Sequence, residues 1–231
     1  MDSAKPRPRL IPVGVVTAIA YVVAAQVGFR FAIVAEQVTT VWAPTGIGMA
    51  ALLLWGTSLW PAIWIGAFVA NAGTDAPLWT AGAVATGNTL EAVVAAWALR
   101  RGGHFNPRLQ RVRDVLAFIV IGALASTAVS ATIGVTALSL SGAQPWERFD
   151  ELWRDWWIGD AVGALVVAPV LLTVRRERPW TRRDGVEGGL LVGGAVAALQ
   201  IVFGGMSATA AHRPLEYVVF PFVIAAAVRR G

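Results

Sequence analysis

Long apolar stretches separated by short polar connections make up almost the whole chain. A helix rises 1.5 Å per residue, so about 20 apolar residues are needed to cross the ~30 Å hydrocarbon layer of a membrane. The pattern predicts eight membrane-spanning helices, at residues 10–29, 40–56, 60–71, 78–99, 115–140, 155–174, 188–206 and 215–228. We therefore expect an all-α fold, a polytopic membrane helical bundle that forms one domain over residues 1–231.

Basic residues gather in alternate connections between these stretches. If the N-terminus is cytoplasmic, 15 of the 19 Lys and Arg residues lie in termini or connections on the cytoplasmic side. Cytoplasmic loops of membrane proteins carry an excess of Lys and Arg. The distribution therefore predicts that the N- and C-termini are both cytoplasmic. An even number of spans agrees with this prediction, because it places both termini on the same side of the membrane.

The connection before the sixth stretch has its own pattern. Its aromatic residues Trp146, Phe149 and Trp153 are spaced three and four apart, which places them on one helical face opposite charged residues. Asp150 and Arg154 have the spacing of an ion pair on a helix. We expect a short amphipathic helix on the outer membrane surface near residues 145–154. The alternative is a lid over a pocket that opens outward.

Composition limits the classes of function. The chain is 56% hydrophobic and 14% charged, with a mean hydropathy of +0.62, whereas soluble domains carry about 25% charged residues. The net charge of +5 follows from loop arginines, so nucleic-acid binding is not expected. The chain has no Cys, and its two histidines, His104 and His212, lie in different connections. With no catalytic motif either, we expect no enzyme activity, no metal site and no cofactor.

Asp160 is the most conspicuous charged residue within an apolar stretch. It follows Trp156 and Trp157 and precedes an apolar run that ends at Arg175. A charge at bilayer depth costs roughly 2.5–3.5 kcal/mol, so such a residue is by default paired or functional. The alternative is a hydrated residue at the interface, because tryptophans mark the headgroup boundary.

Asn88 and Glu91 lie inside the fourth stretch, on the helical face that also carries Val84 and Ala95. Glu91 is the ionisable group expected to lie deepest. A structural hydrogen bond between helices and contact with a ligand both remain open for it. For Asn71, a hydrogen bond between helices is the leading interpretation.

These polar residues suggest a pocket open to the outer face. In this hypothesis Asp160 and Asn88 line the pocket, Glu91 forms its floor, and Arg30 is the natural partner of Asp160. The candidate ligand-binding or switch residues are Asp160, Glu91, Asn88, Asn71, Trp42, Trp156, Trp157 and Arg30.

Small residues recur at helical spacing and predict close helix packing. The fifth stretch has one such residue at every fourth position, and the sixth stretch has a pair around Asp160. The predicted packing residues are Gly122, Ser126, Ser130, Gly134, Gly159 and Gly163.

Several of these segments, taken together and in order, resemble one known family. They are WAPTGIGMAA from Trp42, WPAIWIGAFVAN from Trp60, GNTLEA from Gly87, RLQRVRD from Arg108, SATIG from Ser130 and WWIGDAVG from Trp156. They are similar to the bacterial membrane-associated sensor family MASE, type one, over about residues 10–230. The resemblance implies an integral-membrane input module that is joined to cytoplasmic histidine kinase, diguanylate cyclase, phosphodiesterase or PAS domains.

The expected function is therefore that of a sensory input module in the bacterial inner (plasma) membrane. Its expected partners are the lipid bilayer, a small ligand or a membrane partner protein, a cytoplasmic output domain and, by analogy with the outputs, a second copy of the chain. A small transporter or channel component that uses Glu91 and Asp160 is the alternative, and a structural or chaperone-like membrane partner is a third. The family pattern continues beyond Gly231, so we expect either a C-terminally truncated fragment or a stand-alone relative.

Overall fold

The computed structural model describes residues 10–30 and 41–173. The spans predicted at residues 188–206 and 215–228 lie outside the described residues. Every regular element in residues 10–30 and 41–173 is helical, which confirms the prediction of an all-α fold for this part of the chain. The elements are α1 Leu10–Phe29, α2 Ala43–Trp55, η1 Thr57–Leu59, α3 Trp60–Asn71, α4 Leu78–Arg101, α5 Val112–Ala117, η2 Phe118–Ala125, α6 Thr127–Leu140, η3 Trp146–Arg148 and α7 Phe149–Thr173.

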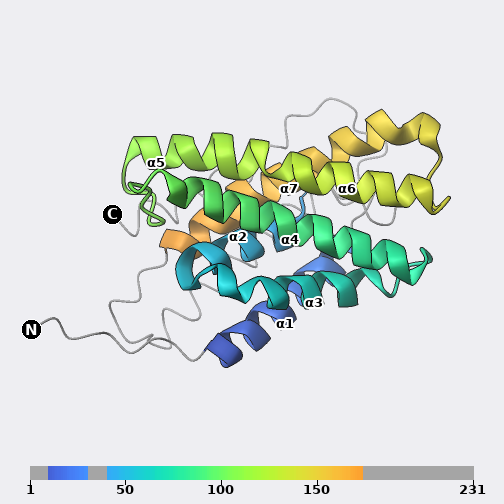
Figure 1. Cartoon of the computed structure of the whole chain (residues 1–231), viewed down its shortest axis with the longest axis horizontal. Helices are drawn as coiled ribbons and strands as arrows, with labels where there is room; N and C mark the ends of the chain where they lie inside the picture. Colours follow the sequence, from blue (N-terminus) through green and yellow to red (C-terminus); the bar gives the residue numbers. More distant parts are fainter. Residues whose placement is uncertain (1–9, 31–40, 174–231) are drawn as a thin grey trace, which may run out of the picture. The chain divides into compact units, whose positions relative to one another are not determined.

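Three helical stretches are long and apolar enough to cross a membrane. They cover Leu10–Phe29, Val112–Leu140 and Trp146–Thr173, and α2 is a shorter apolar helix. The helices lie roughly along a common direction in Figure 1. Among the described residues, the structure thus has the helices that a membrane bundle requires.

The beginning and end of α2 have local causes. Pro44 stands in its first turn, where a residue without a backbone N–H loses no helical hydrogen bond. Gly56 follows the helix with φ of 109°, a conformation that favours glycine, and the chain reverses there into η1 and α3. Arg100 on α4 donates to the carbonyl oxygens of Leu52 and Leu53, each at 2.9 Å. The guanidinium therefore binds the Leu53 carbonyl at the end of α2 together with the Leu52 carbonyl, which also accepts the Gly56 N–H at 3.0 Å.

The predicted fifth span is one continuous helical stretch with a wider section in its middle. Residues Phe118–Ala125 form a π-helical segment between α5 and α6, in which the Ser126 N–H donates to the Ile121 carbonyl five residues earlier. The Leu124 carbonyl in this segment accepts a hydrogen bond from Trp157 Nε1 at 2.8 Å. The wider turn thus provides an acceptor that ties this stretch to α7.

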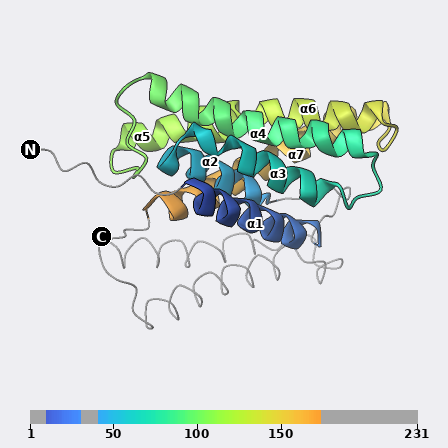
Figure 2. The same cartoon turned by 60° about the horizontal axis from the view of Figure 1, so that its bottom comes forward.

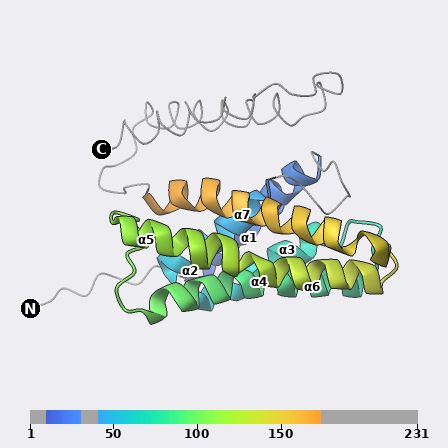
Figure 3. The same cartoon turned by 90° about the horizontal axis from the view of Figure 1, so that it is seen from above.

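The prediction of a separate surface helix near residues 145–154 is wrong. The chain passes through η3 directly into α7, which runs without a break from Phe149 to Thr173 (Figure 3). Leu152 is buried, so this part of the helix packs against the bundle. The charged pair also differs from the expected one, because Arg148 Nε contacts Glu151 Oε2 at 3.0 Å. No proline stands between residues 149 and 160, so no helical hydrogen bond is lost in the segment.

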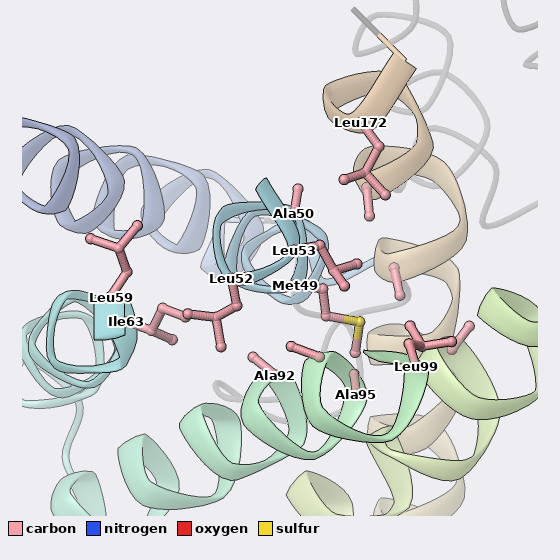
Figure 4. Close-up of a cluster of buried hydrophobic side chains, with 14 of the residues drawn as sticks. Met49, Ala50, Leu52, Leu53, Leu59, Ile63, Ala92, Ala95, Leu99 and Leu172 are labelled. Atoms are coloured by element: carbon pink, nitrogen blue, oxygen red, sulfur yellow. The ribbon is translucent and has the colours of Figure 1, made fainter. Parts of the chain in front are cut away.

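The core lies where α2 packs between α4 and α7. Met49 of α2 points toward Ala95 of α4, and Leu52 lies near Ile63 of α3 (Figure 4). Helix α1 packs on the other side, against α2 and α3 (Figure 2). Helix α6 covers the remaining face of α4 and also contacts α7. Alanines at these contacts let the helix axes approach closely.

The connections lie at two opposite ends of this bundle. The α3–α4 and α6–α7 connections share one end, and the α4–α5 connection lies at the other end, together with the last described residues of α7 (Figures 1 and 3). The α4–α5 end carries Arg100, Arg101, Arg108, Arg111 and Arg113.

Candidate functional site

Two buried carboxyl groups meet at one hydroxyl in the middle of the bundle. Thr45 Oγ1 lies 2.7 Å from Glu91 Oε1 and 2.9 Å from Asp160 Oδ1. Thr45 belongs to α2, Glu91 to α4 and Asp160 to α7. We call Thr45, Glu91 and Asp160 the carboxyl cluster. It joins three helices that are far apart in the sequence.

Glycines on α2 and α7 create this meeting point. A Cβ atom added to Gly46 would lie 2.6 Å from the Gly163 carbonyl oxygen, and one added to Gly163 would collide with the backbone of Trp42. The Trp42 N–H donates to the Gly159 carbonyl at 2.9 Å, so the two backbones are in direct contact. Because Thr45 precedes Gly46 and Asp160 follows Gly159, this contact brings their side chains together.

A second set of hydrogen bonds runs beside the carboxyl cluster. Trp156 Nε1 donates to Ser130 Oγ at 3.1 Å, and Ser130 Oγ donates to Asn88 Oδ1 at 2.7 Å. Asn88 Nδ2 donates in turn to the Tyr21 hydroxyl at 2.9 Å. This chain, which we call the amide chain, links α7, α6, α4 and α1. Both oxygen and nitrogen of the Asn88 amide are therefore satisfied, as a buried amide requires.

Small residues give the amide chain its space. A Cβ atom on Gly134 would lie 2.6 Å from the Trp156 ring, and one on Gly66 would lie 2.9 Å from Tyr21 Cβ. A larger residue at either position would displace the aromatic side chain whose polar atom takes part in the chain. Gly134 and Gly66 are thus parts of the same arrangement.

The carboxyl cluster is enclosed by protein. Glu91 is 0% exposed, and Thr45 and Asp160 are each 1% exposed. Among the described residues, neither carboxyl group forms an ion pair with Lys or Arg. Glu91 Oε2 and Asp160 Oδ2 are buried and accept no hydrogen bond. The arrangement can therefore hold a positive charge or a hydrogen-bond donor, because two uncompensated carboxylates in an apolar interior are very unfavourable.

The structure brings several of the predicted site residues together. Asp160 and Glu91 meet through Thr45, while Asn88 and Trp156 lie in the adjacent amide chain. Trp42 contributes its backbone to the α2–α7 contact, and its ring packs on Phe29 with centroids 5.1 Å apart. These residues form a closed polar core instead of the expected pocket open to the outer face.

Three other predicted residues lie apart from this core. The Asn71 side chain donates to the Ala67 carbonyl of its own helix, at 2.9 Å. Trp157 is half-buried and is bonded to the π-helical segment. Arg30 is exposed after the end of α1 and forms no ion pair with Asp160. Asp160 Oδ1 lies instead against Thr45 Oγ1, at 2.9 Å.

The sequence analysis did not identify Thr45 and Tyr21. Thr45 is a polar residue just before Gly46 in an apolar helix, and a polar residue beside a close-packing glycine is the signal that was available. Tyr21 is one of only two tyrosines in the chain and lies inside the first apolar stretch. Nothing in the local sequence indicates that its hydroxyl would reach Asn88.

The predicted packing residues have different surroundings. Ser130 and Gly134 face α4 and Trp156, and Gly163 faces the α2 backbone. Gly122 lies against Phe118 of its own helical stretch, and Ser126 donates to the Gly122 carbonyl at 2.6 Å. Gly159 is buried and accepts the Trp42 N–H. Among the described residues, no three His, Cys, Asp or Glu side chains gather as a metal site would require.

The comparison with known families now identifies the chain. The family model MASE1 matches residues 13–231, which include all residues of the carboxyl cluster and the amide chain. Neither the curated proteins nor the solved structures provide a match. The chain belongs to the MASE1 family of membrane-associated sensor domains.

Proposed function

We propose that this chain is the integral-membrane input module of a bacterial signal-transduction protein. It receives a small ligand or a membrane partner and passes the change to a cytoplasmic output domain. We further propose eight spans in the inner (plasma) membrane, with both termini in the cytoplasm. The family membership, the three long apolar helices and the arginines at the α4–α5 end of the bundle support this proposal.

The carboxyl cluster is the observation on which the proposal depends most. Two carboxyl groups buried between apolar helices destabilise the fold unless they are neutralised, so their presence favours a role beyond packing. The cluster joins α2, α4 and α7 at a single hydroxyl. A ligand or partner that alters it shifts α7 relative to α4, and α7 leads toward the cytoplasmic end in the proposed topology.

Output measurement on a fusion protein tests the proposal. The chain is joined at its C-terminal end to a diguanylate cyclase domain, and cyclic di-GMP is measured in cells for wild type, Asp160→Asn and Glu91→Gln. Both substitutions keep the shape and remove the charge. We expect both fusions to accumulate in the membrane like wild type and to give an altered output, because the cluster then has a different charge and hydrogen bonding.

Asp150→Asn is the matched control for these two variants. Asp150 is an exposed residue in the first turn of α7, and its substitution removes the same charge from the same helix. Its output should equal that of wild type. Wild-type output from both cluster variants at equal expression would contradict a signalling role.

The two buried carboxyl groups also suit a proton or ion path, which keeps a transporter or channel component as the second candidate. Proteoliposomes that contain the purified chain distinguish the two functions. Flux of protons or Na⁺ that depends on Glu91 and Asp160 would favour transport. Vesicles that stay impermeable to both ions would favour the input module.

A further inference from the structure

We propose that the carboxyl cluster is a proton-binding site in which Glu91 and Asp160 hold one proton between them across Thr45. The inference deepens the proposed function, on which it rests, by naming the proton as the ligand of this site. Three observations on the described residues carry it: the count of hydrogen-bond donors, the enclosure of the cluster and the absence of a neighbouring cation.

The donor count is the first observation. Thr45 Oγ1 lies within hydrogen-bonding distance of Glu91 Oε1 and of Asp160 Oδ1, at 2.7 and 2.9 Å. A threonine hydroxyl has one proton and can donate to only one of them. The other contact is a hydrogen bond only if that carboxyl group is protonated and donates to Thr45. Both distances are therefore explained by one proton on the pair.

The proximity of the two carboxyl groups leads to the same count. Glu91 Oε1 and Asp160 Oδ1 both lie against the same Thr45 hydroxyl. Two carboxylates have no donor and repel each other, whereas a carboxylic acid and a carboxylate attract.

No cation compensates the carboxyl cluster within the described part of the chain. Helix α1 presents Tyr21, α6 presents Ser130, and α7 presents Trp156 to the cluster, and all three side chains are neutral. Helix α2 contributes only Thr45, and the described residues include no Lys or Arg paired with either carboxyl group. Tyr21 is the one further titratable group that faces the pair from the described helices.

A proton suits this geometry better than a metal ion. A bound Na⁺ or divalent ion needs several oxygen ligands around an open centre, and the described residues provide no group of three His, Cys, Asp or Glu. The short Thr45 contacts leave the two carboxyl oxygens already joined through a hydroxyl. Release of the proton leaves two negative charges in contact, which pushes α4 and α7 apart and so gives the module a way to respond.

Infrared spectroscopy of the full chain in lipid bilayers tests the site directly. The carbonyl stretch of a protonated carboxylic acid is separate from the carboxylate bands and shifts in D₂O. We expect wild type at neutral pH to show this band with an intensity of one group per chain. The band should be absent in the double variant Glu91→Gln, Asp160→Asn and retained in Asp150→Asn.

If the double variant fails to fold, the infrared band of wild type alone still decides the question. Absence of the band from wild type at neutral pH would overturn the proposal. Its loss on replacing choline chloride by NaCl at constant pH would also overturn it, in favour of a metal cation. A band that persists in NaCl and disappears only as pH rises supports it.

The same variants separate this inference from the proposed function. A protonated pair in wild type, together with unchanged cyclic di-GMP output from Asp160→Asn and Glu91→Gln fusions, refutes signalling by the cluster and leaves the proton site standing. Altered output without the band refutes the proton and leaves the input function standing.

Discussion

Thr45 is the residue that converts two distant carboxyl groups into one cluster. Its hydroxyl can donate to one carboxyl group and accept from the other, and both contacts are shorter than 3 Å. Serine and threonine are the smallest side chains with this dual ability. Thr45 is buried and stands next to Gly46, where α2 and α7 are in backbone contact.

Replacement of Thr45 by valine should lower the stability of the bundle. Valine keeps the shape but removes the donor for one carboxyl group and the acceptor for the other. The expected loss is about 1–3 kcal/mol, the usual cost of a buried polar group left without its partner. Unfolding of the purified protein in mild detergent, followed by circular dichroism, measures it.

Thr57→Val is the control for this change. Thr57 is exposed in η1, and the same substitution there should leave the unfolding midpoint close to that of wild type. Equal midpoints for the two valine variants would show that the Thr45 hydroxyl contributes nothing to stability.

At the scale of elements, the contact between α2 and α7 determines the site. The Trp42 N–H bonded to the Gly159 carbonyl, and the glycines at positions 46 and 163, hold the two helices at backbone distance. The π-helical segment has a comparable role on the other side, because its Leu124 carbonyl anchors Trp157 of α7. Helix α7 is thus fixed on two sides near Asp160.

A single methyl group at Gly163 should separate α2 from α7. In Gly163→Ala the new Cβ meets the Trp42 carbonyl, which is backbone and cannot move aside as a flexible side chain would. Overpacking of this kind costs about 1–3 kcal/mol. Thermal unfolding in detergent should show a lower midpoint, and Thr45 should lose its contact with Asp160.

Gly82→Ala provides the matched comparison within α4. A Cβ atom at Gly82 meets nothing within 4 Å, and alanine favours a helix over glycine by up to about 1 kcal/mol. This variant should be as stable as wild type or more stable. If Gly163→Ala behaved in the same way, the backbone contact would not limit the packing of α2 on α7.

At the scale of the molecule, charge differs between the two ends of the bundle. The α4–α5 end carries five arginines between residues 100 and 113. The opposite end carries Asp75 and the acidic residues Glu147, Asp150, Glu151 and Asp155, against Arg30, Arg148 and Arg154. Under the positive-inside rule the α4–α5 end faces the cytoplasm.

Reporter fusions test this orientation. Fusions after Gly73 and Gly142, which lie in the α3–α4 and α6–α7 connections, should report the periplasmic side. Fusions after Gly103 and Arg183 should report the cytoplasm, because the basic connections resist translocation. Alkaline phosphatase is active in the periplasm and green fluorescent protein fluoresces in the cytoplasm. Fusing each reporter in turn to the same site therefore gives two independent readings of its location. One reversed site would remove at least one of the proposed spans.

The helical elements were predictable because apolar periodicity is a local property of the sequence. The third span at residues 60–71 coincides with α3, and the fourth at residues 78–99 differs from α4 only at its end. The error at residues 145–154 arose from charged residues that suggested a membrane surface. Leu152 and the absence of a breaker let the helix continue into the bundle.

The sequence by itself determined that this chain forms apolar helices, that it resembles a sensor family, and that Asp160, Glu91 and Asn88 need partners. Only the tertiary structure decided which partners these are. Glu91 and Asp160 lie 69 residues apart in the sequence, and Thr45 lies still further from Asp160. Their meeting depends on glycine contacts between helices, and a buried carboxyl group accepts whichever donor that packing places within about 3 Å.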